Sequence, residues 1–170
     1  GIDIKIFFPS EQNKIRVRRT LNISDSDIIL ISTARLDIVK RLDRLIDAFN
    51  IIAALRNDVQ LFFAGTGPEL NNLTGMTKKL ETGIKKRIRF LGNCDNIPEI
   101  LQACDIYVLP SDSEGLPLAC LEAMSCGLIT VVTDSPGSSE IMKNGMNGFL
   151  VERSSEGVLN GLNKALSLSV

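Results

Sequence analysis

Short apolar segments alternate with segments of helical periodicity along most of this sequence. The apolar segments predict strands over Ile28–Thr33, Val59–Ala64, Ile88–Leu91, Ile106–Leu109, Ile129–Val132 and Phe149–Val151. The other segments predict helices over Leu42–Arg56, Pro68–Thr82, Ile97–Ala103, Pro117–Met124, Ser138–Lys143 and Ser155–Leu166. Because such alternation builds right-handed strand–helix–strand units, we expect an α/β fold. This is a doubly wound, Rossmann-like parallel sheet of about six strands with helices on both faces.

The chain has 170 residues, which suits a single domain over residues 1–170. Lys and Arg number 19 and Asp and Glu number 20, for a formal charge of −1, and the two signs are intermixed. No basic field is therefore available to attract nucleic acid or an anionic membrane surface. We expect neither as a partner of this domain.

The cysteines show no CxxC spacing and lie in or beside apolar segments, at Cys94, Cys104, Cys120 and Cys126. The sequence has no histidine, so a zinc site would need thiolates and carboxylates alone. Reduced packing cysteines, no signal-peptide pattern and no long apolar run predict a cytoplasmic domain. The full-length protein could lie at the inner face of a membrane.

The stretch Asp105–Asp134 reads as strand, polar turn, helix and strand, and Glu114 and Glu122 bracket the turn and the helix start. Ligands of parallel sheets bind outside the carboxyl ends of the strands, where Glu114 would lie. Along a helix, eight residues span at most roughly 12 Å, so one elongated ligand could contact both carboxylates. The alternative is that Glu114 only complements a helix dipole and Glu122 lies on a solvated face.

Two cations follow the first strand, Arg35 and Lys40. A guanidinium and an ammonium at the carboxyl end of a strand can share a diphosphate, although each alone is also typical of a solvated surface charge. Gly65-Thr66-Gly67-Pro68 follows the second strand, but Leu70 occupies the last glycine position of a dinucleotide-binding fingerprint. NAD binding is therefore disfavoured, and the glycines predict a tight turn.

Two further polar segments flank the predicted strands. Asp25-Ser26-Asp27 precedes the first strand, at the end of the sheet away from the ligand crevice, so we expect no metal there. Asp134–Glu140 leaves the fifth strand, with Ser138 or Ser139 as the predicted helix cap. Glu140 could complement that helix dipole or contact a ligand.

From Gly1 to about Val151, the chain resembles the C-terminal, donor-binding domain of retaining GT-B glycosyltransferases of glycosyltransferase family 4. The matching pieces, in order, are GID with IFFP, ARL with Lys40 and LIDAF, AGTGPEL, RIRFLG, ACDIYVLPSDSEGLPLACLEAMSCG, TDSPGSSEI and NGMNGFLV. Glu114 and Glu122 match the family's E-x7-E motif.

The resemblance implies roles for particular residues. Arg35 and Lys40 would bind the donor diphosphate, Glu114 would contact the donor sugar, and Glu122 would contact the ribose. Backbone N–H groups around Gly115, Leu116 and Leu118 would hold the phosphates or the sugar, Asn93 would lie near the base, and Gly137 and Glu140 would complete the site. No cofactor, metal or protein nucleophile is implied.

Three positions depart from the family pattern. Ala34 and Arg41 replace usual glycines before the arginine and after the lysine, and Pro117 stands where many members have a glycine. Proline has no N–H, so this position cannot donate a backbone hydrogen bond to the ligand. None of the three changes removes a side chain with an implied role.

The resemblance implies transfer of a hexosyl unit from a nucleotide-diphosphate sugar to a saccharide or lipid-linked acceptor. In the family, a separate N-terminal domain binds the acceptor, and this sequence does not contain that domain. We therefore expect this chain alone to bind nucleotide sugars weakly and to transfer little. Two alternatives stay open: another GT-B enzyme, such as a phosphorylase or a nucleotide-sugar epimerase, or a non-catalytic module that keeps the fold.

Overall fold

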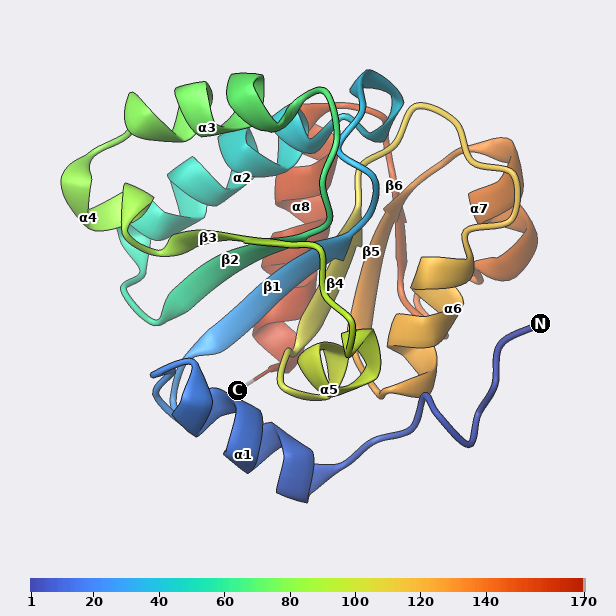
Figure 1. The fold of residues 1–170 in the computed structure, drawn as a ribbon. Helices are drawn as coiled ribbons and strands as arrows, with labels where there is room; N and C mark the ends of the chain where they lie inside the picture. Colours follow the sequence, from blue (N-terminus) through green and yellow to red (C-terminus); the bar gives the residue numbers. More distant parts are fainter. Residues whose placement is uncertain (170) are drawn as a thin grey trace.

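The computed structural model describes residues 1–169 and places the six predicted strands in one sheet (Figure 1). The strands are β1 (Ile28–Thr33), β2 (Val59–Ala64), β3 (Ile88–Gly92), β4 (Ile106–Leu109), β5 (Ile129–Thr133) and β6 (Phe149–Val151). All neighbours are parallel, in the order β3-β2-β1-β4-β5-β6. The predicted parallel sheet is confirmed.

Helices cover both faces of the sheet, as predicted. They are α1 (Glu11–Thr20), α2 (Leu42–Leu55), α3 (Leu70–Lys78), α4 (Thr82–Lys85), α5 (Ile97–Gln102), α6 (Leu118–Ser125), α7 (Pro136–Ile141) and α8 (Ser155–Leu168), with a 3-10 helix, η1 (Ile38–Lys40), after β1. Side chains of α2, α3, α4 and α8 pack on one face, and those of α1, α5 and α6 on the other (Figure 1). Residues of the central strands therefore alternate between two cores: Leu30 and Val108 enter the first, and Ile31 and Leu109 the second.

The predicted helix over Pro68–Thr82 is wrong in its length, because the structure contains two helices, α3 and α4, in this region. The first helix ends in short turns, with the N–H of Lys79 donating to Met76 and that of Leu80 to Thr77. Glu81 then takes an extended backbone, with φ −54° and ψ 144°. The chain changes direction at Glu81, and Ile84 of α4 is buried in the first core.

The predicted cap of the helix over Ser138–Lys143 is also wrong. Helix α7 begins at Pro136, and the residue at its N-cap is Ser135. Proline suits the first helical turn because its φ is already helical and it needs no partner for an N–H. Ser138 is instead buried within the helix, where its hydroxyl lies 2.9 Å from that of Ser135.

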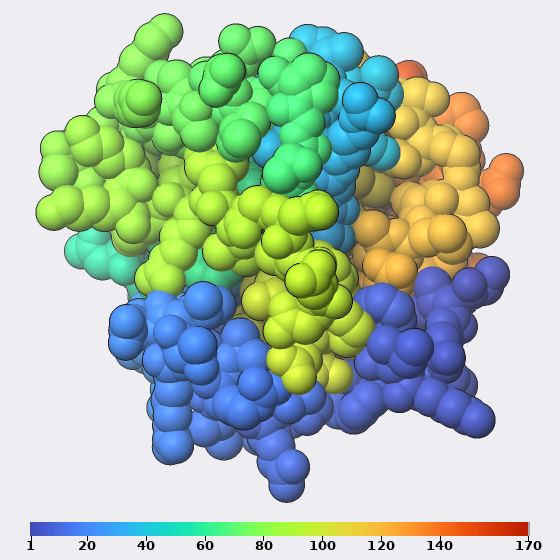
Figure 2. Space-filling view, viewed as in Figure 1, coloured from blue at the N-terminus to red at the C-terminus, as the bar shows by residue number. Residues whose placement is uncertain are grey.

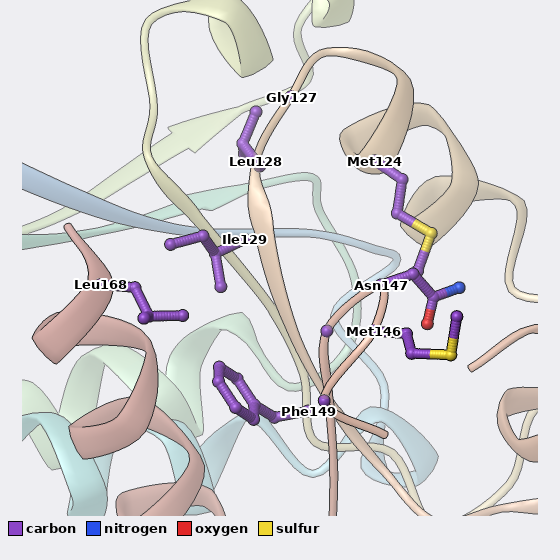
Figure 3. A pocket seen from close by; sticks show the side chains of 10 residues that line it. Met124, Gly127, Leu128, Ile129, Met146, Asn147, Phe149 and Leu168 are labelled. Carbon is purple, nitrogen blue, oxygen red and sulfur yellow. The ribbon is translucent and has the colours of Figure 1, made fainter. Parts of the chain in front are cut away.

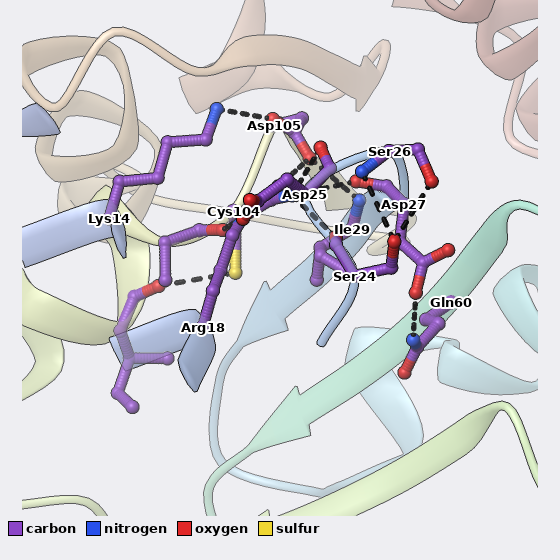
Figure 4. A network of polar contacts seen from close by, with 12 residues as sticks. Lys14, Arg18, Ser24, Asp25, Ser26, Asp27, Ile29, Gln60, Cys104 and Asp105 are labelled. Carbon is purple, nitrogen blue, oxygen red and sulfur yellow. Dashed lines mark hydrogen bonds and ion pairs between the residues drawn. The ribbon is translucent and has the colours of Figure 1, made fainter. Parts of the chain in front are cut away.

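A polar network joins α1 to the amino ends of β1 and β4 (Figure 4). The guanidinium of Arg18 is 2% exposed; it donates to the carbonyls of Ala103 and Asp27 and pairs with Asp105 at 2.6 Å. The carboxylate of Asp27 accepts from the amide of Gln60 at 2.6 Å. Asp25-Ser26-Asp27 thus lies at the amino end of the sheet, as predicted, and these interactions hold it to the fold.

The N-terminal loop and α1 lie along the lower edge of the second face, beside α5 (Figure 2). Asn13 of α1 donates to Gln102 of α5 at 2.7 Å, and Arg16 pairs with Glu99 at 2.7 Å. Within residues 1–169, no helix has both the length and the apolar character needed to cross a membrane.

Candidate functional site

The order of the strands in the sheet reverses between β1 and β4. These two strands are neighbours in space although β2 and β3 intervene in the sequence. After β1 the chain runs to the first face through α2, and after β4 it runs to the second face through α6. The two connecting segments therefore separate at the carboxyl ends of these strands. Such a topological switch point is where doubly wound sheets bind ligands.

A cleft of about 580 Å³ opens at these carboxyl ends. Its walls come from segments after β1, β2 and β3 and from the helices α5 and α6: Thr33, Ala34, Arg35, Ala64, Gly65, Thr66, Gly67, Asn93, Cys94, Ile97, Ala119 and Glu122. The structure thus brings together three predicted site residues, Arg35, Asn93 and Glu122, from distant parts of the chain.

The glycine turn after β2 forms the wall between the first two loops. A Cβ on Gly65 would overlap the carbonyl oxygen of Ala34, and the φ of Gly65 is +139°. The two loops therefore approach more closely than a side chain would allow. This supports the prediction of a tight turn at Gly65–Pro68.

Lys40 and Glu114 form an ion pair across the switch point. The ammonium of Lys40, at the end of η1, lies 2.8 Å from Oε1 and 3.0 Å from Oε2 of Glu114, in the turn after β4. The side chains are 23% and 10% exposed, so solvent screens the pair less than it would screen a surface pair. A cation and a carboxylate are therefore held together at the switch point.

Glu122 lies on α6 and faces the cleft. Partial burial raises the pKa of its carboxyl above the ordinary value. Within residues 1–169, neither a hydrogen bond nor an ion pair occupies this carboxylate, and the same is true of the guanidinium of Arg35. Both groups are thus available to a ligand.

The turn after Glu114 is partly closed in this conformation. The N–H of Leu118 donates to the carbonyl of Leu116 at 2.9 Å, and Pro117, at the N-cap of α6, has no N–H. In this conformation the N–H of Leu118 is therefore paired within the chain, and its contact with a ligand stays a prediction. Gly115 and Leu116 are exposed, and within the described residues their N–H groups have no partner in the chain.

Gly137 and Glu140 lie on α7, next to this turn. The N–H of Gly137 donates to the carbonyl of Glu114 at 3.1 Å, and a Cβ there would overlap the carbonyl oxygens of Gly115 and Glu114. Gly137 thus supports the turn that carries Glu114, and its N–H is not free for a ligand in this conformation. Glu140 is exposed and outside the cleft.

The sequence of the chain also matches a known protein family. The family model described as glycosyl transferases group 1 matches residues 13–169 of the chain. The chain belongs to the group 1 glycosyl transferases. The predicted glycosyltransferase family is confirmed at the level of group 1 by a match over nearly the whole sequence, whereas retention and membership of family 4 stay predictions.

Several known proteins are similar to most of this chain in sequence or structure. N-acetyl-alpha-D-glucosaminyl L-malate synthase of Bacillus anthracis is 33% identical over 151 residues, which cover 89% of this chain and 38% of that protein. A crystal structure of Anabaena HepE in complex with UDP-glucose is 27% identical, with a TM-score of 0.89 over 99% of this chain and 47% of that one. The C-terminal domain of the group 1 protein LpcC of Francisella tularensis is 27% identical, with a TM-score of 0.85 over 98% of this chain and 88% of that domain. The chain thus spans less than half the length of the first two proteins.

The structure also explains one departure from the family pattern. Arg41 takes a left-handed backbone, with φ 48° and ψ 43°, which glycine adopts without strain. Its guanidinium pairs with Asp43 at 2.9 Å and with Asp112 at 3.2 Å. These ion pairs offset part of the backbone strain at a position where the family usually has glycine.

The sequence alone did not reveal the residues that hold the turn carrying Glu114. Arg44 of α2 is buried and contacts this turn at Pro110 and Asp112. The hydroxyl of Thr133 donates to the carbonyl of Ser111 at 2.6 Å. Arg44 lies outside the matching pieces, and the piece TDSPGSSEI, which begins at Thr133, does not indicate a contact with Ser111. Only the packing of α2 and β5 against the turn shows these contacts.

A second cavity, of about 360 Å³, lies at the opposite end of β5 and β6 (Figure 3). Apolar side chains line most of it, among them Leu128, Ile129, Met146, Phe149 and Leu168. It contains no charged side chain that could complement a diphosphate. The polar cleft at the switch point is therefore the candidate site for a nucleotide. Within residues 1–169, no cluster of His, Cys, Asp or Glu has the arrangement of a metal site.

Proposed function

We propose that this chain is the donor-binding domain of a retaining glycosyltransferase that moves a hexosyl unit from a nucleotide-diphosphate sugar to a saccharide or lipid-linked acceptor. The observation that carries the proposal is the juxtaposition, at the switch point, of the Lys40–Glu114 pair with a cleft that holds Arg35 and Glu122. Membership of the group 1 family supports it, as does the similarity to a structure that contains UDP-glucose.

Each side chain has a role that suits its chemistry. Arg35 and Lys40 neutralise the donor diphosphate, because unit charges about 4 Å apart interact by about 4 kcal/mol at an effective dielectric of 20. Glu122 accepts hydrogen bonds from the ribose hydroxyls, and Glu114 accepts them from the donor sugar. Asn93, at the edge of the cleft, lies near the base.

The reaction breaks the bond between the anomeric carbon of the sugar and the diphosphate oxygen, and the electron pair stays on that oxygen. The acceptor oxygen forms the new bond on the same face of the sugar, and its proton passes to the departing phosphate. Fixed cations stabilise the charge that develops on this phosphate. We propose that Arg35 and Lys40 perform this task without a metal ion.

The acceptor would bind to a separate N-terminal domain, as the partial coverage of the relatives suggests. We propose that this second domain closes over the cleft and that the chain alone transfers little. The whole protein would act in the cytoplasm, where nucleotide sugars are available.

A titration tests the proposal. UDP, GDP, ADP and their sugar conjugates are added to the chain and to the variants Lys40→Ala and Glu122→Ala, with the exposed Lys164→Ala as control. We expect one base to stabilise the chain against thermal unfolding, since stabilisation grows with ligand concentration over Kd. Each site variant should weaken this effect by about tenfold or more in Kd, because a hydrogen bond to a charged group contributes about 1.5–3 kcal/mol.

The proposal fails if none of these nucleotides binds, or if the site variants bind as well as Lys164→Ala does. With the full-length enzyme, release of free nucleotide only when an acceptor sugar is present would identify transfer. The absence of such acceptor-dependent release would favour a nucleotide-sugar epimerase or a phosphorylase, and no binding at all would favour a non-catalytic module.

A further inference from the structure

The turn between β4 and α6 carries Glu114, and its position decides where that carboxylate lies. The turn begins at Pro110 and is not part of a helix or strand. A carboxylate on such a segment keeps one position only if other groups hold the segment. The residues that hold this turn in place therefore help to position the Glu114 carboxylate.

Arg44 holds this turn at two points. Its Nη1 donates to the carbonyl of Pro110 at 3.0 Å, and its Nη2 lies 2.7 Å from Oδ1 of Asp112. The side chain is only 9% exposed and comes from α2, on the opposite side of the switch point from α6. A planar guanidinium with several fixed donors can bind two points of one turn, whereas an ammonium cannot do so with the same geometry.

Asp112 connects the same turn to the segment that carries Lys40. Its N–H donates to the carbonyl of Val39 at 2.9 Å, and its carboxylate also pairs with Arg41 at 3.2 Å. Val39 and Arg41 flank Lys40 in the sequence. The two segments that present Lys40 and Glu114 are thus joined through Asp112, and Arg44 fixes that junction from α2.

Stability alone is a weak reason for a buried arginine at this place. Removing a guanidinium from water costs several kcal/mol, and apolar residues of similar volume often give equal or greater stability. The apolar stripe of α2, which includes Leu45, Ile46 and Phe49, already anchors this helix in the first core. What Arg44 adds is a fixed geometry for the turn.

We propose that Arg44 is a positioning residue for donor recognition. It holds the Pro110–Glu114 turn so that the Glu114 carboxylate stays against Lys40 and within reach of the glycosyl part of the donor. This inference rests on the proposed function, because it assigns Glu114 to the sugar and the rest of the cleft to the nucleotide. It predicts that a looser turn weakens recognition of the sugar more than recognition of the nucleotide.

The experiment compares Arg44→Met and Arg44→Lys with a matched control, Arg87→Met. Arg87 also donates to backbone carbonyls, those of Arg56 and Ala53, but at the opposite end of the sheet. The ligands are the nucleoside diphosphate that wild type binds most tightly among UDP, GDP and ADP, and the matching nucleotide sugars. Hydrogen exchange at the amides of Asp112 and Gly137 is measured in parallel, because both amides bond across the turn.

For Arg44→Met we expect about tenfold weaker binding of the nucleotide sugar, about unchanged binding of the nucleoside diphosphate, and faster exchange at both amides. Arg44→Lys should recover part of the loss, and Arg87→Met should change neither the affinity ratio nor these amides. If Arg44→Met does not fold, Asp112→Asn, at a half-exposed side chain, must show the same shift in the ratio.

Three outcomes would overturn the inference. The two affinities could fall by the same factor, which indicates general destabilisation. The ratio and the exchange rates could stay unchanged, which indicates that the turn holds its position without Arg44. If wild type binds neither ligand, the proposed function fails first, and the role of Arg44 in donor recognition fails with it.

Discussion

The ammonium of Lys40 and the carboxylate of Glu114 lie 2.8 Å apart, although 74 positions separate the two residues in the chain. The contact exists because β1 and β4 are neighbours in the sheet and their following segments diverge. In the unliganded protein, Glu114 therefore neutralises the cation that is proposed to bind phosphate. A bound diphosphate would have to share Lys40 with Glu114.

This sharing predicts opposite effects for Glu114→Gln on two ligands. Binding of the nucleoside diphosphate should stay equal or strengthen by up to about fivefold, because Lys40 loses a competing anion worth about 1 kcal/mol. Binding of the nucleotide sugar should weaken by about tenfold, because the amide is a poorer acceptor for sugar hydroxyls than a carboxylate. Calorimetric titration of both ligands measures the two affinities.

Glu140→Gln is the control for the Glu114 variant, since Glu140 is exposed and lies outside the cleft. Equal losses for both ligands in Glu114→Gln would contradict the assignment of Glu114 to the sugar. If Glu140→Gln changes the affinities for the two ligands as much as Glu114→Gln does, the net charge of the domain, rather than the position of the charge, decides the affinity.

At neutral pH, the Glu122 carboxylate should lower the stability of the folded chain while it contributes to nucleotide binding. Burial raises the pKa of its carboxyl, so the folded protein holds this proton more tightly than the unfolded chain does. Stability therefore falls as pH rises from the ordinary pKa of 4.5 to the raised pKa of the folded state. Glu122→Gln should therefore raise the melting temperature of the unliganded chain at neutral pH. The gain should be full above the raised pKa and vanish as pH falls below the ordinary value of 4.5.

The same Glu122→Gln variant should bind nucleotide more weakly at neutral pH, because the carboxylate is proposed to accept the ribose hydroxyls. Denaturant unfolding across the pH range, with Glu81→Gln as an exposed control, measures the stability change. A gain in stability that does not depend on pH would show that the effect of Glu122 is not electrostatic.

Gly137→Ala should displace the turn that carries Glu114. The added Cβ would overlap the carbonyl oxygens of Gly115 and Glu114, and overpacking of this kind costs about 1–3 kcal/mol. The hydrogen bond from Gly137 to Glu114 would be lost with it. Gly75→Ala in α3 has open space around its Cβ and should instead stabilise the protein by about 0.5–1 kcal/mol. Equal effects of the two substitutions on unfolding would contradict this view of the turn.

The strands could be predicted from the sequence because they read as apolar runs. The four central strands are almost wholly buried, and the edge strands β3 and β6 are mostly half-buried. The errors in the predicted elements concern two helices: one is divided into α3 and α4, and α7 begins before its predicted cap. The causes are local. The break at Glu81 depends on the burial of Ile84, and the start of α7 depends on Pro136 rather than on the serines after it. A periodicity of apolar residues contains little information on either point.

The side chains of the cleft were also predictable, since Arg35 and Glu122 follow from their places after β1 and on α6. Arg44 was not. It lies beside the apolar stripe of α2, where a charged residue usually faces solvent, and its partner Pro110 is 66 positions away. Which turn a helix side chain meets is decided by the packing of the whole sheet, and no local pattern records it.

Arg41 offers a test of backbone strain at the site. Because its φ is 48°, Arg41→Gly should be more stable than Arg41→Ala by about 1 kcal/mol, since alanine keeps the left-handed strain that glycine avoids. Both variants lose the same half-exposed ion pairs, so the difference isolates the backbone. Ala54→Gly, at an exposed helical position of α2, should show the opposite order, with glycine less stable by about 0.5–1 kcal/mol. Denaturant unfolding gives both differences. If alanine proves at least as stable as glycine at position 41, the left-handed backbone does not persist in solution, and the link between Lys40 and the turn of Glu114 must be looser than the structure shows.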